Sequence, residues 1–310
     1  MRLLVTGADG FVGNYLLREL IFRGHDVIAG YFELEPRVAC QNTKIDITDS
    51  VLLEEVLRKY QPDGVIHLAA QSNVKLSWDN PAITVKVNTE GTIILLETIA
   101  KISEEIKVVC VGSSEEYGSS ALTGEPLTEL DVCYPQNPYA VSKFAAGLLA
   151  LQIAKKENLN VIYARPFNHF GPGQPRGFIV SDFASQIAQV EQGLMDNVIR
   201  VGDLGAKRDF TDVRDVVNAY ALLMEKEVEP GIYNICSGSP RSAREILEFL
   251  IEGAKVPVHF QVDQERYRSS EVPFFVGSAE KIKKAVSWKI NKDFFESLTE
   301  TLGWWRTKKF

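Results

Sequence analysis

The sequence has few residues of the kinds that build metal centres and disulfide frameworks. Its 310 residues include only four cysteines and four histidines. The cysteines are widely separated, form no C-x-x-C pair and have no histidine cluster nearby, so neither a zinc site nor a disulfide framework is indicated. We therefore expect no bound metal, and reduced thiols in a cytoplasmic protein.

Long apolar runs and a surplus of basic residues are also missing. No run approaches the roughly 20 apolar residues that a membrane span requires, and the chain opens directly on strand-like residues, so neither a membrane segment nor a signal peptide is expected. The formal net charge is -7, which leaves no basic surface for nucleic acid. Apolar residues make up 45% and charged residues 24%, a balance typical of a soluble globular protein with ample core.

A glycine-rich segment follows the first apolar run. Residues 2–6 read as a buried strand and residues 14–21 have helical periodicity, with Gly7, Gly10 and Gly13 between them. A strand, a glycine loop and a helix in this order predict a dinucleotide phosphate site, because the backbone can approach a pyrophosphate whose charge lies at the helix N-terminus. The expected cofactor contacts in this loop are Gly7, Gly10, Phe11 and Val12.

The second predicted strand, residues 25–31, leaves the choice of dinucleotide open. The end of this strand usually carries an acid that binds the ribose 2′-hydroxyl of NAD, or a basic residue that suits the 2′-phosphate of NADP. Here the strand ends in Gly30 and Tyr31, followed by Glu33 and, further on, Arg37. Neither pattern is satisfied, so NADPH and NADH both remain candidates.

Strands and helices then alternate along the first half of the chain. The segments with this alternation are residues 50–60, 65–70, 93–100, 106–111 and 160–166. The alternation predicts an α/β fold, a Rossmann-type doubly wound parallel sheet with a smaller mixed α/β C-terminal substrate domain. We interpret His67, inside one of these strands, as a core histidine.

The pattern changes after Pro166, where a loop crowded with glycine and proline begins. Loops at the carboxyl ends of parallel strands commonly carry ligands. We expect a dinucleotide-binding domain over residues 1–166, with 210–238 returning to it. A substrate-binding domain would then comprise residues 167–209 and 239–310.

Residues 137–143, Asn-Pro-Tyr-Ala-Val-Ser-Lys, predict the start of a helix that carries an acid–base group. Pro138 suits a first helical position, and a long apolar run follows. Tyr139 and Lys143 would then lie one turn apart on the same face. A phenol normally loses its proton near pH ~10, and an adjacent ammonium lowers that pKa. The pair suits proton transfer to a carbonyl or from an alcohol.

Ser113 follows the apolar run of residues 106–111. A hydroxyl at such a strand end can hydrogen-bond a carbonyl oxygen from the side opposite the tyrosine.

The helices around residues 91–102 and 140–155 are apolar on more than one face, and one sheet covers only one side of each. We therefore expect a homodimer formed through these two helices.

In this order, the three glycines, Ser113, and Tyr139 with Lys143 resemble the extended short-chain dehydrogenase/reductase family over nearly the whole chain. In that family the tyrosine donates or accepts the proton. The lysine lowers the tyrosine pKa and bonds the nicotinamide ribose, and the serine holds the substrate oxygen. The resemblance implies Ser113, Tyr139 and Lys143 as catalytic residues. Further expected cofactor contacts, besides Tyr139 and Lys143, are Asp46, Ile47, Leu68, Ala69, Ala70, Asn88 and Pro166.

Within this family, four segments look like those of the reductases that act on GDP-4-keto-6-deoxy-D-mannose and form GDP-D-rhamnose. The segments are residues 164–174, 208–216, 233–238 and 268–273. The resemblance implies reduction of the 4-keto group by NADPH or NADH. It assigns the substrate diphosphate to Asn168, Arg208 and Arg268, and the guanosine ribose to Glu271. Ser114 and Glu115 are further expected substrate contacts.

Three other functions share some of these features. A GDP-mannose 4,6-dehydratase has the same triad and a glutamate that removes a proton from sugar C5, and Glu115 occupies the matching place. A nucleotide-sugar 4-epimerase is a second alternative in the family. A dinucleotide-binding regulator without turnover is the alternative from a different class, although the Ser-Tyr-Lys set argues against it.

Overall fold

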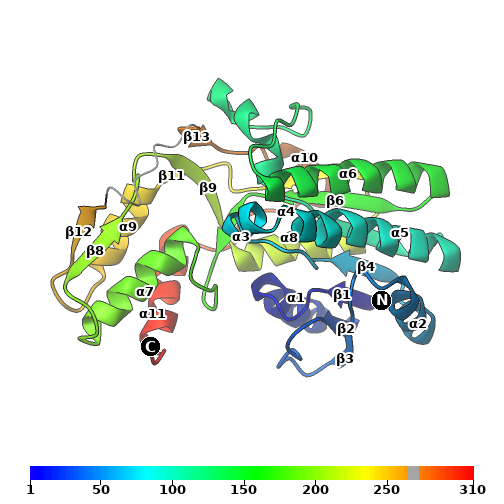
Figure 1. The fold of residues 1–310 in the computed structure, drawn as a ribbon, viewed down its shortest axis with the longest axis horizontal. Helices are drawn as coiled ribbons and strands as arrows, with labels where there is room; N and C mark the ends of the chain where they lie inside the picture. Colours follow the sequence, from blue (N-terminus) through cyan, green and yellow to red (C-terminus); the bar gives the residue numbers. More distant parts are fainter. Residues whose placement is uncertain (264–271) are drawn as a thin grey trace.

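The structure, a computed structural model, describes residues 1–263 and 272–310. Its larger part contains a seven-stranded sheet in the order β10-β6-β5-β4-β1-β2-β3, in which every pair is parallel (Figure 1). The strands are β1 (Arg2–Thr6), β2 (Asp26–Tyr31), β3 (Gln41–Lys44), β4 (Gly64–His67), β5 (Lys107–Val111), β6 (Val161–Pro166) and β10 (Gly231–Ile235).

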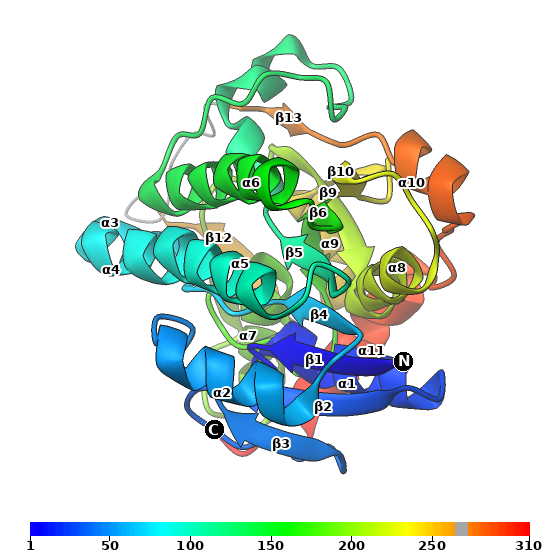
Figure 2. The ribbon, with the colours of Figure 1, turned by 90° about the vertical axis from the view of Figure 1, so that its right-hand side faces the viewer.

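Helices cover both faces of this sheet. On one face are α1 (Phe11–Phe22) and α8 (Val213–Glu225), and on the other are α2 (Ser50–Tyr60), α5 (Gly91–Ile102) and α6 (Pro138–Glu157) (Figure 2). Three short segments precede α5: α3 (Val74–Asp79), α4 (Pro81–Val85) and the π-helical turn η1 (Lys86–Glu90). The sheet is therefore the middle of three layers.

Strand β1 shows why the central strands read as continuous apolar runs. Leu3 and Val5 are fully buried in the core that includes α1 and α8, whereas Leu4 is fully buried in the core on the opposite face. A parallel strand covered by helices on both sides has no solvent-facing positions, so the polar–apolar alternation of a half-exposed strand is absent.

The smaller part contains two further sheets and its own core. In the first sheet, β9 (Lys207–Asp212) pairs with β7 (Asn168–Phe170), β11 (Pro240–Ser242) and β13 (Phe274–Phe275). The second pairs β8 (Val198–Val201) with β12 (His259–Val262). Helices α7 (Ile179–Glu191), α9 (Ala243–Glu252) and α11 (Phe294–Arg306) share one apolar core with β7, β8, β9 and β12. The predicted fold class is therefore confirmed.

Three late elements of the chain pack on the larger part. Strand β10 pairs with β6 at the edge of the seven-stranded sheet, and α8 covers one face of that sheet. Helix α10 (Glu280–Val286) lies beside β10, where Lys281 Nζ donates to the carbonyl oxygen of Ile232 at 2.6 Å. The chain thus crosses between its two parts more than once.

Candidate active site

The loop between β1 and α1 has the tight packing that a phosphate-binding turn requires. Gly7 has φ +68°, and a Cβ there would lie 2.7 Å from the backbone nitrogen of Ala69. A Cβ at Gly13 would lie 2.6 Å from the carbonyl oxygen of Gly7. Neighbouring backbone excludes a side chain at both positions, so the turn is tight, and a tight turn at the N-terminus of α1 suits the binding of a pyrophosphate. The residues present therefore fit a dinucleotide.

The neighbouring strand ends lie along the same edge of the sheet. Residues 68–70 follow β4, which pairs with β1, and Pro166 is the last residue of β6. Asn88 ties this edge together: its Nδ2 donates to Ser142 Oγ on α6 at 2.9 Å, and its Oδ1 accepts from the backbone N–H of Gln71 at 2.8 Å. The amide of Asn88 thus fixes the segment after β4 against α6.

The two residues predicted after β3 are engaged with the protein itself. Asp46 Oδ1 accepts from the backbone nitrogen and the hydroxyl of Thr48, at 2.9 and 2.8 Å. Ile47 is buried, and its side chain packs close against Gly91 at the start of α5. Their roles as cofactor contacts stay predictions.

His67, at the end of β4, is confirmed as a core histidine. Its Nδ1 lies 2.7 Å from Thr6 Oγ1 and its Nε2 lies 3.1 Å from Thr92 Oγ1, so both ring nitrogens have hydroxyl partners. Burial, with a contribution from the Lys143 charge, lowers its pKa to about 3. The ring is therefore neutral at physiological pH.

Helix α6 begins as the sequence predicts, and it places Tyr139 and Lys143 at the carboxyl edge of the sheet. Asn137 is the N-cap, its Oδ1 accepting from the Ala140 N–H at 2.8 Å, and Pro138 is the first helical residue. Lys143 is buried and donates through Nζ to the carbonyl oxygen of Val111, the last residue of β5, at 2.8 Å. Tyr139 lies one turn earlier and hydrogen-bonds with the Ser113 side chain.

Ser113 is the N-cap of the 3₁₀ turn η2 (Ser114–Tyr117) and lies two residues beyond the end of β5. Its Oγ accepts from the backbone N–H of Glu115 at 3.2 Å, and its side chain is 8% exposed within the site. The structure therefore brings Ser113, Tyr139 and Lys143 together at the carboxyl end of β5. The neighbouring strand is β4, which precedes Ala69.

The acid–base properties of the pair differ from the expectation based on spacing alone. Burial raises the pKa of Tyr139, and although its hydrogen bond with Ser113 acts in the opposite direction, the net shift is upward. The expectation that Lys143 leaves Tyr139 with a lowered pKa is therefore wrong for the protein by itself. Burial also lowers the pKa of Lys143, to about 8, against a smaller opposite effect of Glu116. Both groups share one desolvated crevice, where burial disfavours each charged form.

A buried ion pair supports this site and was missed by sequence reasoning. Glu116 has no exposed surface, and its Oε2 accepts from Arg165 Nε and Nη2 at 3.1 and 2.9 Å. Its Oε1 accepts from the backbone N–H of Ser113 at 2.8 Å and from the Tyr163 hydroxyl at 2.9 Å. The Tyr163 hydroxyl is also 2.7 Å from the carbonyl oxygen of Lys143. One carboxylate thus links the turn carrying Ser113 to α6.

Arg165 is held from a second side as well. Its guanidinium lies 4.5 Å from the centroid of the Tyr117 ring, and the Tyr117 hydroxyl donates to Asn234 Oδ1 at 2.8 Å. Burial, the largest single effect, would lower the pKa of Arg165, but Glu116, Tyr117 and Cys133 together outweigh it and the net shift is upward. The pair is therefore charged and closely packed beneath the turn.

Four of the expected substrate contacts lie in the described part of the chain. Ser114 is buried beside Ser113, and Glu115 Oε2 accepts from Asn137 Nδ2 at 3.2 Å. Asn168 begins β7, which pairs with β9, the strand that carries Arg208. Burial lowers the pKa of Arg208 whereas the Glu115 charge raises it, so this guanidinium is electrostatically coupled to the turn at the active site. Arg268 and Glu271 lie outside the described residues.

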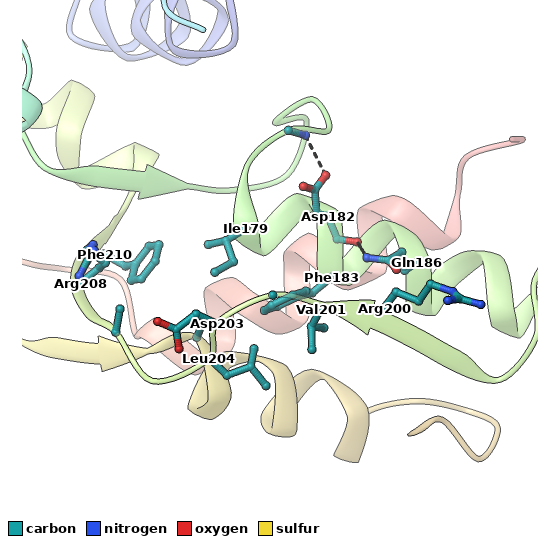
Figure 3. A pocket seen from close by; sticks show the side chains of 14 residues that line it. Ile179, Asp182, Phe183, Gln186, Arg200, Val201, Asp203, Leu204, Arg208 and Phe210 are labelled. Atoms are coloured by element: carbon teal, nitrogen blue, oxygen red, sulfur yellow. Dashed lines mark hydrogen bonds between the residues drawn. The ribbon is translucent and has the colours of Figure 1, made fainter. Parts of the chain in front are cut away.

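Beside Arg208 the smaller part contains a cavity of about 450 Å³. Figure 3 shows Arg208 and Phe210 of β9 at one end, Asp182 and Gln186 of α7 along its side, and Arg200 of β8 at the other end. The lining also includes Gly177, Ile179, Phe183, Val201, Gly202, Asp203, Leu204, Ala206 and Ala243. Apart from Arg208, none of these residues was predicted from the sequence as a ligand contact, because they converge from separate elements without a local motif.

A family model described as GDP-mannose 4,6 dehydratase matches residues 4–301. The chain belongs to this family. The family is a branch of the extended short-chain dehydrogenases/reductases, so the resemblance noted in the sequence is confirmed.

Individual relatives cover the chain almost completely. A GDP-6-deoxy-D-mannose reductase from Pseudomonas aeruginosa is 36% identical over 99% of this chain and 98% of its own. The human GDP-mannose 4,6 dehydratase is 28% identical over 96% of this chain and 89% of its own. The chain is therefore an NAD(P)-dependent, nucleotide-sugar-modifying member of the family.

Solved structures show the same likeness. The structure of RMD from Pseudomonas aeruginosa complexed with NADPH superimposes with a TM-score of 0.89 at 35% identity, covering 99% of both chains. The UDP-glucose 4-epimerase of Thermus thermophilus in complex with NAD has a TM-score of 0.87 at 27% identity, again covering 99% of both chains.

Neither a metal-binding cluster nor a membrane-spanning helix is present within residues 1–263 and 272–310. Within these ranges, no three or more His, Cys, Asp or Glu side chains are grouped so that they could hold a metal ion. No described helix is both long and apolar enough to cross a membrane. All four cysteines are free thiols, with Cys110 and Cys236 buried.

Proposed function

We propose that this chain reduces the 4-keto group of GDP-4-keto-6-deoxy-D-mannose to form GDP-D-rhamnose, with NADPH or NADH as the reductant. The observation that carries the proposal is the meeting of Ser113, Tyr139 and Lys143 at the carboxyl end of β5. The 36% identity to a GDP-6-deoxy-D-mannose reductase over 99% of the chain favours this substrate.

Each of the three side chains has a separate role in carbonyl reduction. The reduced nicotinamide, when bound, supplies the hydride. The Ser113 hydroxyl donates a hydrogen bond to the carbonyl oxygen as negative charge builds on it. Tyr139 remains protonated at neutral pH because burial raises its pKa, and it gives its proton to that oxygen. The nearby Lys143 ammonium then stabilises the phenolate that remains.

The cavity beside Arg208 suits the remainder of the substrate. We place the nucleotide in this cavity, whose lining combines apolar side chains such as Phe183 with polar ones such as Gln186. Asn168 and Arg208 would contact the diphosphate, because guanidinium groups match phosphate oxygens. The same proposal assigns Arg268 to the diphosphate and Glu271 to the guanosine ribose.

A GDP-mannose 4,6-dehydratase is the second candidate, and one contact favours it. Glu115 lies two residues after Ser113, and the N-cap residue Asn137 holds its carboxylate at 3.2 Å. A carboxylate fixed in this position could serve as the base that removes the C5 proton in a dehydratase. Cofactor stoichiometry separates the two reactions.

The decisive assay uses two incubations of purified protein. One contains GDP-mannose alone, and the other contains GDP-4-keto-6-deoxymannose with NADH or NADPH. We expect reduced cofactor to be consumed in equimolar amounts with the sugar in the second tube, and no reaction in the first. Formation of the keto sugar in the first tube, without net cofactor use, would instead identify a dehydratase.

We also propose a homodimer formed through α5 and α6. Val141, Leu148 and Leu149 on α6 are 46%, 49% and 40% exposed, and their spacing places them along one face of the helix. Short helices beside α6 add Trp78 at 62% and Ile83 at 58% exposed. A contiguous apolar surface of this kind is typical of an oligomer interface.

Replacing Leu148 with Glu should convert the dimer to a monomer, because a carboxylate would be desolvated at the interface. Light scattering after size-exclusion chromatography measures the change directly, with a twofold drop in mass expected. Leu130→Glu is the matched control, since Leu130 is 94% exposed and lies outside α6, in the loop that precedes it. A wild-type mass equal to that of one chain would rule out this dimer.

A further inference from the structure

The carboxylate of Asp9 joins the glycine loop to the segment that follows β2. Its Oδ2 accepts hydrogen bonds from three successive backbone N–H groups, those of Phe32, Glu33 and Leu34, at 3.3, 3.0 and 3.3 Å. Asp9 lies between the glycines of the β1–α1 turn, and β2 ends at Tyr31. The contact therefore lies at the mouth of the dinucleotide site.

This is the place where such sheets distinguish the two nicotinamide dinucleotides. The adenosine ribose is recognised at the end of β2, where a hydroxyl acceptor suits NAD and a phosphate-binding group suits NADP. Successive backbone N–H groups that converge on one point form an anion-binding nest. In this chain the nest already holds a carboxylate, so its three donors are directed at Asp9 rather than outward.

The charged side chains around Asp9 also disfavour a ribose 2′-phosphate. Glu33 and Glu35 both follow β2, and both are exposed. Glu35 is further positioned by Asn42 on β3, whose Nδ2 donates to its Oε1 at 2.7 Å. Between residues 30 and 40 the sequence has one cation, Arg37, against these two acids. With Asp9 added, a 2′-phosphate would meet a surplus of negative charge.

We propose that Asp9, assisted by Glu33, makes this chain select NADH over NADPH. The inference rests on the proposed function only in placing a dinucleotide at the glycine loop. A ribose 2′-hydroxyl can donate to the Asp9 carboxylate, whose Oδ1 takes none of the three backbone bonds. A 2′-phosphate has no hydrogen to donate when fully ionised, and it is repelled. This preference differs from that suggested by the Pseudomonas structure, which contains NADPH.

The test is equilibrium binding, followed by nicotinamide fluorescence and without any sugar. We expect the wild-type dissociation constant for NADH to be at least ~10-fold lower than that for NADPH. Asp9→Asn keeps an oxygen for the three backbone donors but removes the charge. It should reduce the ratio of the NADPH dissociation constant to the NADH dissociation constant to about 3 or less. Glu33→Gln should lower the ratio by a smaller factor. Glu252→Gln, which neutralises an exposed carboxylate on α9, should leave the ratio unchanged.

The possible results separate this inference from the proposed function. Wild-type affinity for NADPH equal to or tighter than that for NADH overturns the inference alone. An unchanged ratio in a folded Asp9→Asn variant would show that Asp9 does not determine the preference for NADH, and it overturns the inference. If that variant does not fold, Glu33→Arg decides, because it should tighten NADPH at least ~5-fold, and no gain overturns the inference. Failure to bind either dinucleotide overturns the proposed function as well.

Discussion

Replacing Tyr139 with Phe is expected to reduce turnover by about 10²–10⁴-fold, because general acid catalysis typically contributes that much. The substitution removes one hydroxyl from a side chain that hydrogen-bonds with Ser113 and leaves the ring in place. Binding of the reduced dinucleotide should therefore change by no more than about twofold. Turnover is measured as consumption of reduced cofactor with the keto sugar, and binding by fluorescence titration.

A second phenol provides the control. Tyr60→Phe removes a hydroxyl from the last residue of α2, where it accepts a hydrogen bond from Lys59 Nζ at 3.1 Å, and full activity is expected. Wild-type turnover in Tyr139→Phe would reject Tyr139 as the acid. Loss of dinucleotide binding together with turnover would show that the phenol acts through the structure of the site instead.

Replacing Glu116 with Leu is expected to lower the free energy of unfolding by about 3–5 kcal/mol. The change leaves the Arg165 guanidinium buried without its carboxylate partner, and it leaves the backbone N–H of Ser113 without an acceptor. Turnover should fall as well, since the turn carrying Ser113 loses its support. Urea unfolding at neutral pH measures the stability.

Two comparisons make this prediction specific. Adding Arg165→Met to Glu116→Leu should recover much of the lost stability, because the second change removes the stranded charge. Glu248→Leu disrupts the exposed Arg244–Glu248 pair, 3.4 Å apart, and should cost no more than about 1 kcal/mol. A cost for Glu116→Leu as small as that of the exposed pair would refute the structural role of the buried ion pair.

Local sequence patterns predicted the elements that depend on neighbours in the chain. The β1–α1 turn follows from glycines whose positions exclude side chains, and the start of α6 follows from Asn137 and Pro138. Tyr139 and Lys143 share a helix face because their spacing is four residues. In each case the physical cause lies within a few residues, so the feature can be predicted from the local sequence.

Features that depend on packing could not be predicted in this way. Glu116 and Arg165 are 49 positions apart, and an acid in a Ser-Ser-Glu-Glu turn looks like ordinary solvated loop chemistry. The upward pKa shift of Tyr139 depends on burial, which spacing does not reveal. The cavity beside Arg208 is assembled from α7, β8, β9 and α9, and no single stretch of sequence signals it.

The most direct test of the central claim follows a labelled hydride into the sugar. Protein is incubated with GDP-4-keto-6-deoxymannose and reduced dinucleotide that carries deuterium at the transferable position of nicotinamide C4. Reduction through Ser113, Tyr139 and Lys143 predicts one deuterium at sugar C4, with oxidised dinucleotide formed in equal amount. Full retention of deuterium on the cofactor, with no alcohol formed at C4, would contradict the account.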